Sequence, residues 1–161
     1  MFENEIAINE FLIRQLEIIA KDIPDDDLFP PSVGHGHSPI WILGHLAISG
    51  EMGHRLLGGS IAHPEWLRLF GPGSAGTVSS DVQLTKQGLV STIIETYERF
   101  RELALAADAK VATTPHSVNL FTGTSIKTVA HCITHLLTSH FSFHLAQLSS
   151  CRRVAGYGAI F

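Results

Sequence analysis

The chain has 161 residues and a formal net charge of −4 with neutral histidines, and 45% of its residues are hydrophobic against 16% charged. Such a composition supports a hydrophobic core and argues against a disordered chain. The acidic balance excludes a protein that binds nucleic acid through a basic surface. The length suits one domain over residues 1–161. Histidine is the unusual feature, because there are 10 histidines against 11 lysines and arginines together.

The first predicted helix covers residues 3–22. Apolar residues recur there at the three- and four-residue spacing of one helix face, and Pro24 follows the last of them. The apolar positions that carry this pattern are Ile8, Phe11, Leu12, Ile18 and Ile19. Residues 24–38 are dense in proline, glycine and aspartate, so they are predicted to form a loop.

A second helix is predicted from residue 39 to about residue 57. Ser38 is a favoured N-cap residue, and Pro39 suits the first helical position because an N–H there would have no partner within the helix. Gly58 and Gly59 follow this helix. Residues 58–84 contain the runs HPEW and GPGSAG and are predicted to be irregular.

Two further long helices are predicted in the second half of the chain. Thr85 is an N-cap candidate for a helix that reaches about Ala107, and Thr124 can cap a fourth helix that reaches about Val154, before the helix-ending Gly156. No stretch alternates between apolar and polar residues in the manner of a strand. Four long amphipathic helices predict an all-α fold of the four-helix-bundle type.

The helix positions of the histidines separate inward from outward side chains. At about 100° per residue, His45 falls in the apolar stripe of the second helix. On the fourth helix, His144 and apolar residues such as Val129 and Val154 lie within about 40° of His140, so His140 and His144 fall in the apolar stripe. The remaining histidines are expected on outward helix faces, namely His54, His131 and His135, or in loops, namely His35, His37, His63 and His116.

The three inward histidines favour a metal site. His140 and His144 are one helical turn apart, which places two imidazoles about 6 Å apart at Cβ and suits two ligands of one cation. His45 from another helix would complete a set of three protein ligands with open positions, as in catalytic metal sites. The alternative is that each is an ordinary core residue with hydrogen-bond partners for both ring nitrogens.

The two cysteines indicate the compartment. Cys132 and Cys151 fall on the same predicted helix, about 28 Å apart, so they cannot form a disulfide with each other. Free cysteines are typical of a reducing cytoplasm. The acidic N-terminal segment is unlike a signal peptide, and no run of about 18 apolar residues predicts a membrane span. We therefore expect a cytoplasmic protein that has no membrane partner.

Motifs in both halves of the chain resemble those of the DinB/YfiT-like domain family. The first half contains SPIWILGHLA (38–47), RLLGG (55–59) and HPEWLRLFGPGS (63–74), and the second half contains HLLTSHFSFHLAQL (135–148) and CRRVAG (151–156). The family's last helix carries roughly H-x-x-x-H, then a small residue and Gln. Ala146 stands in this chain where that small residue is commonly Gly.

This resemblance implies a four-helix bundle that holds a divalent metal, most often Zn or Ni, through His45, His140 and His144. It also implies a homodimer. Characterised members of the family include transferases and isomerases that use low-molecular-weight thiols such as bacillithiol or mycothiol. Many other members are grouped as metal-dependent hydrolases without a known reaction.

The function hypothesis is therefore a metal-dependent enzyme that transfers a thiol to a small electrophilic substrate. A cation on three neutral imidazoles keeps its full charge and acidifies a bound thiol or water. Metal-dependent hydrolysis is a close alternative, and a bundle that binds a metal or small ligand without turnover is another. Trp41, Met52 and Gln147 are candidates for pocket lining, although core packing or a structural hydrogen bond also explains them. Neither cysteine is expected to be the nucleophile.

Overall fold

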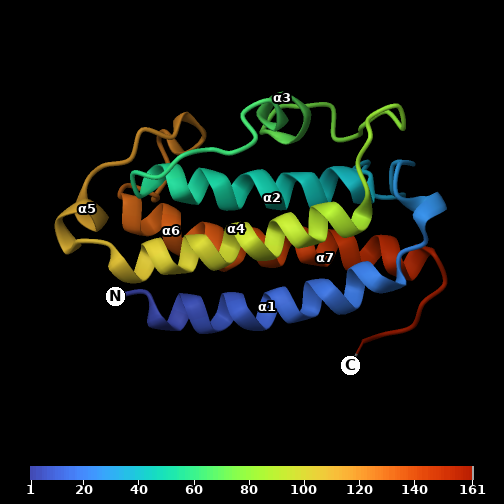
Figure 1. Cartoon of the computed structure of the whole chain (residues 1–161), viewed down its shortest axis with the longest axis horizontal. Coiled ribbons are helices and arrows are strands. Elements are labelled where there is room, and N and C mark those ends of the chain that lie inside the picture. The colour runs from blue at the N-terminus through green and yellow to red at the C-terminus, as the bar shows by residue number, and fades with distance from the viewer. Residues whose placement is uncertain (161) are drawn as a thin grey trace.

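The computed structural model describes residues 1–160, and these residues are all-α. Figure 1 shows long helices running side by side with connecting segments at their ends. The long helices are α1 (Glu3–Asp22), α2 (Pro39–Leu56), α4 (Lys86–Ala106), α6 (Val129–Leu137) and α7 (Ser139–Val154). Shorter elements are η1 (Asp25–Asp27), α3 (Trp66–Phe70), α5 (Ala109–Thr113) and η2 (Asn119–Phe121). The predicted all-α class is confirmed.

The long helices close into a bundle. α2 packs against α4, α4 against α1, α1 against α7, and α7 against α2 (Figure 1). α6 continues the same rod as α7, so the fourth side of the bundle consists of two helices end to end. α2 also contacts α3 and α6, and every residue from Pro39 to Glu51 is buried. α2 is therefore buried on nearly all sides, so most side chains on this helix lie in the interior of the bundle.

The N-caps explain where two of these helices begin. The Ser38 hydroxyl accepts a hydrogen bond from the Trp41 N–H at 3.4 Å, and Thr85 Oγ1 accepts one from the Gly88 N–H at 3.1 Å. These bonds satisfy amide groups that have no partner within the first turn. The predicted bounds of α1, α2 and α4 agree with the structure to within one residue.

The fourth predicted helix is wrong in two respects. It begins at Val129 with Thr128 as the N-cap, four residues after the start implied by a cap at Thr124, and it breaks at Thr138. Thr138 has φ −121° and ψ −86°, and its hydroxyl donates to the Thr134 carbonyl at 2.6 Å, a contact that bends helices. The Leu137 carbonyl, which a continuous helix would pair with an N–H four residues later, accepts a hydrogen bond from Asn9 Nδ2 at 2.9 Å.

Close packing of α2 depends on glycines. A Cβ on Gly44 would lie 2.4 Å from the Phe70 ring, and a Cβ on Gly53 would lie 2.5 Å from the Phe100 ring. Glycine inside a helix lowers helix stability by about 1 kcal/mol relative to alanine. The two glycines therefore reduce the helix propensity of α2 but allow it to contact two buried aromatic rings. The result is that α3 and α4 lie directly against α2.

The burial pattern corrects several smaller expectations. Val154 was placed in the core stripe but is 61% exposed, because α7 ends there. Of the apolar positions that predicted α1, Leu12 and Ile19 are buried, whereas Ile8 and Phe11 are about half exposed. α3 interrupts the segment 58–84, which is predicted to be irregular. Within residues 1–160, no helix combines the length and apolar character needed to cross a membrane.

Candidate metal centre

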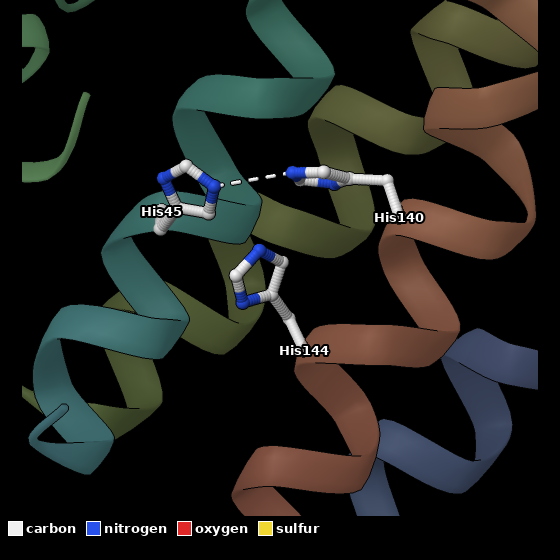
Figure 2. Close-up of side chains that lie close together, drawn as sticks. All are labelled: His45, His140 and His144. Atoms are coloured by element: carbon white, nitrogen blue, oxygen red, sulfur yellow. Dashed lines mark hydrogen bonds between the residues drawn. The ribbon is translucent and has the colours of Figure 1, made fainter. Parts of the chain in front are cut away.

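Three histidines converge between α2 and α7. His45 comes from α2, and His140 and His144 come from successive turns of α7, with all three rings directed into the space between the two helices (Figure 2). One ring nitrogen from each residue lies within 4.8 Å of the others. His45 and His144 are buried and His140 is half-buried. Within residues 1–160 this is the one group of three histidine, cysteine or acidic side chains with such a spacing.

The ring of His45 is fixed on two sides. Its Nδ1 lies 2.5 Å from the carbonyl oxygen of Phe70, so this nitrogen carries the proton and donates it. The Trp41 ring, one turn earlier on α2, stacks on the imidazole with centroids 4.7 Å apart and planes 10° apart. Nε2 therefore presents a lone pair to the site. Backbone carbonyls commonly orient metal-binding histidines in this way.

His144 is oriented by a chain of polar contacts. Its Nδ1 lies 2.8 Å from Gln147 Oε1, so Nδ1 carries the proton and Nε2 is free to accept. The Gln147 amide nitrogen lies 3.3 Å from Nδ1 of His37. His37 in turn stacks on Trp41 with centroids 4.4 Å apart. The same Trp41 that packs on His45 is therefore linked to the partner of His144, which couples the orientations of the two rings.

The donor set fits a divalent cation. His45 Nε2 and His140 Nε2 lie 3.1 Å apart, which is close to the separation of about 3–3.4 Å between two nitrogens bound to one ion at about 2.1 Å. His140 Nδ1 is buried and has no hydrogen-bond partner within residues 1–160. Lone pairs that face one another repel unless a proton or a cation lies between them. Neutral imidazole nitrogens are typical ligands of Zn²⁺, Ni²⁺ and Cu²⁺.

The electrostatics of the site keep the histidines neutral. Burial, together with the neighbouring rings of His144 and His45, lowers the pKa of His140 to about 2. Burial and the nearby His45 lower the pKa of His144 to about 3, and burial also lowers the pKa of His45. A histidine must be unprotonated to bind a metal. Near neutral pH the site therefore offers its lone pairs without first losing protons.

A largely apolar chamber of about 560 Å³ opens beside the three histidines. Its walls include the side chains of Met52, Leu56, Leu67, Val118, Phe121 and Phe143. Within residues 1–160, no aspartate, glutamate, lysine or arginine lines it. Cys132 also lines the chamber, and burial raises the pKa of its thiol. A site of this size, with one polar end and apolar walls, suits a small ligand.

The chain matches a known protein family over most of its length. A family model described as the DinB superfamily matches residues 10–148, which is most of the chain. The chain belongs to the DinB superfamily. The matched range of this DinB-superfamily protein includes all three converging histidines. No curated protein and no solved structure matches the chain.

The pocket residues predicted for this DinB-superfamily protein have different places in the structure. Met52 lines the chamber. Trp41 and Gln147 are not among the chamber-lining residues within 1–160, and instead they contact the rings of His45 and His144. Both residues therefore contact the histidine rings and do not line the chamber.

Two histidines expected to face solvent do not. His135 lines the chamber, with its ring centroid 5.5 Å from that of His140 and its Nδ1 2.8 Å from Ser139 Oγ. The break at Thr138 changes the phase between α6 and α7, so angles counted from His140 along one straight helix do not apply to His135. His54 is half-buried and bonds to the Thr96 carbonyl at 2.7 Å, since α2 is covered on nearly all sides. His131 is exposed, as predicted.

Several positioning residues of the DinB-superfamily site were missed from sequence. His37 was assigned to a loop without further role, and Phe70 fell in the segment predicted to be irregular. A Pro-Glu pair before residues 66–70, four of which are apolar, with Gly71 after them, is the pattern that could have identified α3. The carbonyl of Phe70 at the end of this short helix is the acceptor for His45.

A buried carboxylate holds the segment that leads to α3. Glu51 is fully buried, and its Oε2 accepts the backbone N–H groups of Ala62 and His63 at 2.9 and 3.0 Å. Its Oε1 accepts from His63 Nδ1 at 2.5 Å. These bonds satisfy a carboxylate that would otherwise be costly to bury. They also fix where the chain returns to α2, and hence where Phe70 meets His45.

The low pKa values predict an acid-sensitive fold in the metal-free protein. The unfolded chain binds protons on histidine below about pH 6.5, whereas His140 and His144 resist protonation in the folded state down to about pH 2 to 3. The unfolded state thus binds more protons, so the free energy of unfolding should fall as the pH drops from about 6.5 toward about 3. Denaturant titration of metal-free protein at about pH 7 and about pH 5 measures this.

The His140→Leu variant is the matched comparison for this prediction. It lacks one of the two strongly shifted groups, so its stability should depend less steeply on pH than that of the wild type. A wild-type stability that stays level over this range would contradict the buried neutral state of these histidines.

Proposed function

We propose that this protein is a metal-dependent S-transferase that joins a small thiol to an electrophilic substrate. The cation, Zn²⁺ or Ni²⁺, would be held by Nε2 of His45, His140 and His144. The observation that carries this proposal is the convergence of three neutral imidazoles at one end of an apolar chamber. Membership of the DinB superfamily supports it, and the proposal goes beyond that membership in naming a reaction.

The protein's own residues prepare the site for a thiol. Phe70 and Gln147 hold protons on the Nδ1 atoms of His45 and His144, so that only Nε2 faces inward. When bound, a divalent cation lowers the pKa of a coordinated thiol and supplies a thiolate at neutral pH. Cys132 does not compete as a nucleophile, because burial keeps its own thiol protonated.

The chamber favours transfer of a thiol to an electrophile over hydrolysis. Its apolar walls offer few hydrogen bonds to water and leave room for the carbon framework of an electrophile. In the proposed step, the thiolate sulfur forms a bond to the electrophilic carbon while the bond from that carbon to the leaving group breaks. The leaving group departs with the electron pair, and the proton released by the thiol passes to water.

The test uses a fluorogenic electrophile. Untagged protein loaded with Zn²⁺ or Ni²⁺ should conjugate monobromobimane to at least one member of a panel of cellular thiols, on the order of 100-fold faster than metal-free protein. The His140→Ala variant should lose this acceleration, whereas His131→Ala, on the exposed face of α6, should keep it. Product fluorescence measures the rate.

Two other results would assign a different function. Equal conjugation rates with and without metal, for every thiol in the panel, would contradict S-transfer. Accelerated hydrolysis of a chromogenic ester by the loaded protein, without any thiol-dependent product, would indicate a metal-dependent hydrolase. Metal binding without either activity would indicate a binding module.

A further inference from the structure

A second cavity adjoins the chamber at the C-terminal end of α2. It has a volume of about 450 Å³, and we call it the annex. The annex and the chamber share Met52, Leu56 and Val118 as a common wall. The other side of the annex is formed by residues 115–119, which are part of the segment between α5 and η2 together with the first residue of η2. A ligand at the three histidines therefore has a neighbouring space into which it can extend.

The annex carries a positive charge that no side chain neutralises. Arg55 is the one charged side chain among the described residues that line it, and it takes part in none of the ion pairs found within residues 1–160. Ser117 and Asn119 add neutral hydrogen-bonding groups. Arg55 is exposed, so its guanidinium keeps its donors available to a ligand.

His116 also lines the annex but has a structural role. Its Nε2 donates to the Ile126 carbonyl at 2.9 Å, and its Nδ1 accepts from the Val118 N–H at 3.1 Å. Both ring nitrogens are thus occupied in one neutral tautomer. These bonds hold the loop that forms the outer wall of the annex, and they leave Arg55 as its source of charge.

The chamber and the annex differ in the chemistry that they accept. The chamber has apolar walls and no lysine or arginine among its described lining residues, so away from the cation proposed at the three histidines it offers no counter-charge to an anion. The annex offers a guanidinium whose paired N–H groups match the two oxygens of a carboxylate. Together they suit a ligand that has an apolar part and one anionic group.

We propose that the annex binds a carboxylate group of the ligand whose reactive end lies at the three histidines, and that Arg55 is the partner of this carboxylate. The inference rests on the proposed function, because it describes the far end of the thiol or electrophile that the site would bind. Arg55 follows His45 by ten residues on α2, about 15 Å along the helix axis. The ligand is therefore an extended molecule with its carboxylate well separated from its reactive atom.

The first arm of the test needs no metal. Calorimetric titration of metal-free protein with octanoate and with octanol compares two probes that differ in the terminal group. Wild type should bind octanoate on the order of 10-fold more tightly than octanol. Arg55→Gln should remove this preference, and Arg55→Lys should keep part of it because it retains the charge without the paired N–H groups. Arg14→Gln, an exposed arginine on α1, is the matched control and should bind like wild type.

The results of this arm decide the inference. Equal binding of octanoate and octanol by wild type would overturn it, and so would a preference that persists in Arg55→Gln. Because Arg55 is exposed, its replacement should leave the thermal unfolding transition unchanged. A loss of the octanoate preference can then be assigned to the lost charge.

The second arm separates this inference from the proposed function. Protein loaded with Ni²⁺ is titrated with ω-mercapto-octanoate, whose thiol can reach the histidines, and sulfur-to-nickel charge-transfer absorption is recorded. Absorption that appears in wild type and weakens in Arg55→Gln supports both proposals. An octanoate preference without any such absorption supports the annex and contradicts thiol binding at the metal.

Discussion

Replacing His144 with alanine should abolish tight, stoichiometric binding of Zn²⁺ or Ni²⁺ while the helical fold is retained. The variant loses one of three nitrogens that lie within 4.8 Å of each other. Loss of an outer residue that only orients a ligand costs about 10- to 100-fold in metal affinity, so loss of a ligand should cost more than about 100-fold. The measurement is a competition titration with a chromogenic chelator on protein purified without a histidine tag.

The fold of the His144→Ala variant should survive, because the side chain borders the chamber rather than the centre of the bundle. Circular dichroism checks this directly. His131→Ala is the matched control, since it removes an exposed imidazole from the adjoining helix and should leave metal binding unchanged. One equivalent of metal bound by His144→Ala with wild-type affinity would contradict the three-histidine site.

Gly44→Ala should destabilise the protein and weaken metal binding together. The added Cβ would lie 2.4 to 2.5 Å from three ring carbons of Phe70, whose side chain is fully buried and cannot move into solvent. Alanine gains about 1 kcal/mol in helix propensity, but overpacking of a close-packed core costs about 1 to 3 kcal/mol or more. With contacts this short, the clash should win by about 2 kcal/mol.

The metal effect of Gly44→Ala follows from the same contact. A shifted Phe70 moves the carbonyl that orients His45, which should lower metal affinity by about 10- to 100-fold. Denaturant unfolding and the chelator titration measure the two effects. Gly158→Ala, where a Cβ meets open space, should change stability by less than about 0.5 kcal/mol.

A second substitution distinguishes a local clash from a general loss of stability. Phe70→Leu removes the ring carbons that the new Cβ would meet, so the double variant Gly44→Ala/Phe70→Leu should be more stable than the sum of the two single changes implies. Strictly additive losses would show that Gly44 and Phe70 do not interact as described.

The helix pattern and the three histidines could be predicted because both depend on local spacing. His45 lies in the stripe of apolar residues on α2. His140 and His144 are one turn apart and both follow the break at Thr138, so the break does not change their relative orientation. The break itself could not be predicted, since the Asn9 amide that bonds the Leu137 carbonyl is 128 residues away in the chain. His135 was assigned to the wrong environment for this reason.

The contacts that orient His45 and His144 could not be predicted from the sequence either. The Phe70 carbonyl reaches His45 only because the segment after α2 folds back onto this helix. No regularly spaced pattern of residues in the sequence indicates a contact of this kind. His37 meets Gln147 from a loop 110 residues earlier. The single domain over residues 1–161, the homodimer and the cytoplasmic location remain predictions.

X-ray absorption spectroscopy at the metal edge is the most direct test of the three-histidine centre. We predict that untagged wild-type protein loaded with one equivalent of Zn²⁺ shows the multiple-scattering pattern of three imidazoles, with nitrogen at about 2.0 to 2.1 Å. His140→Ala protein should not reproduce this pattern. A wild-type spectrum with a sulfur shell at about 2.3 Å, with fewer than three imidazoles, or with no retained metal would contradict the account.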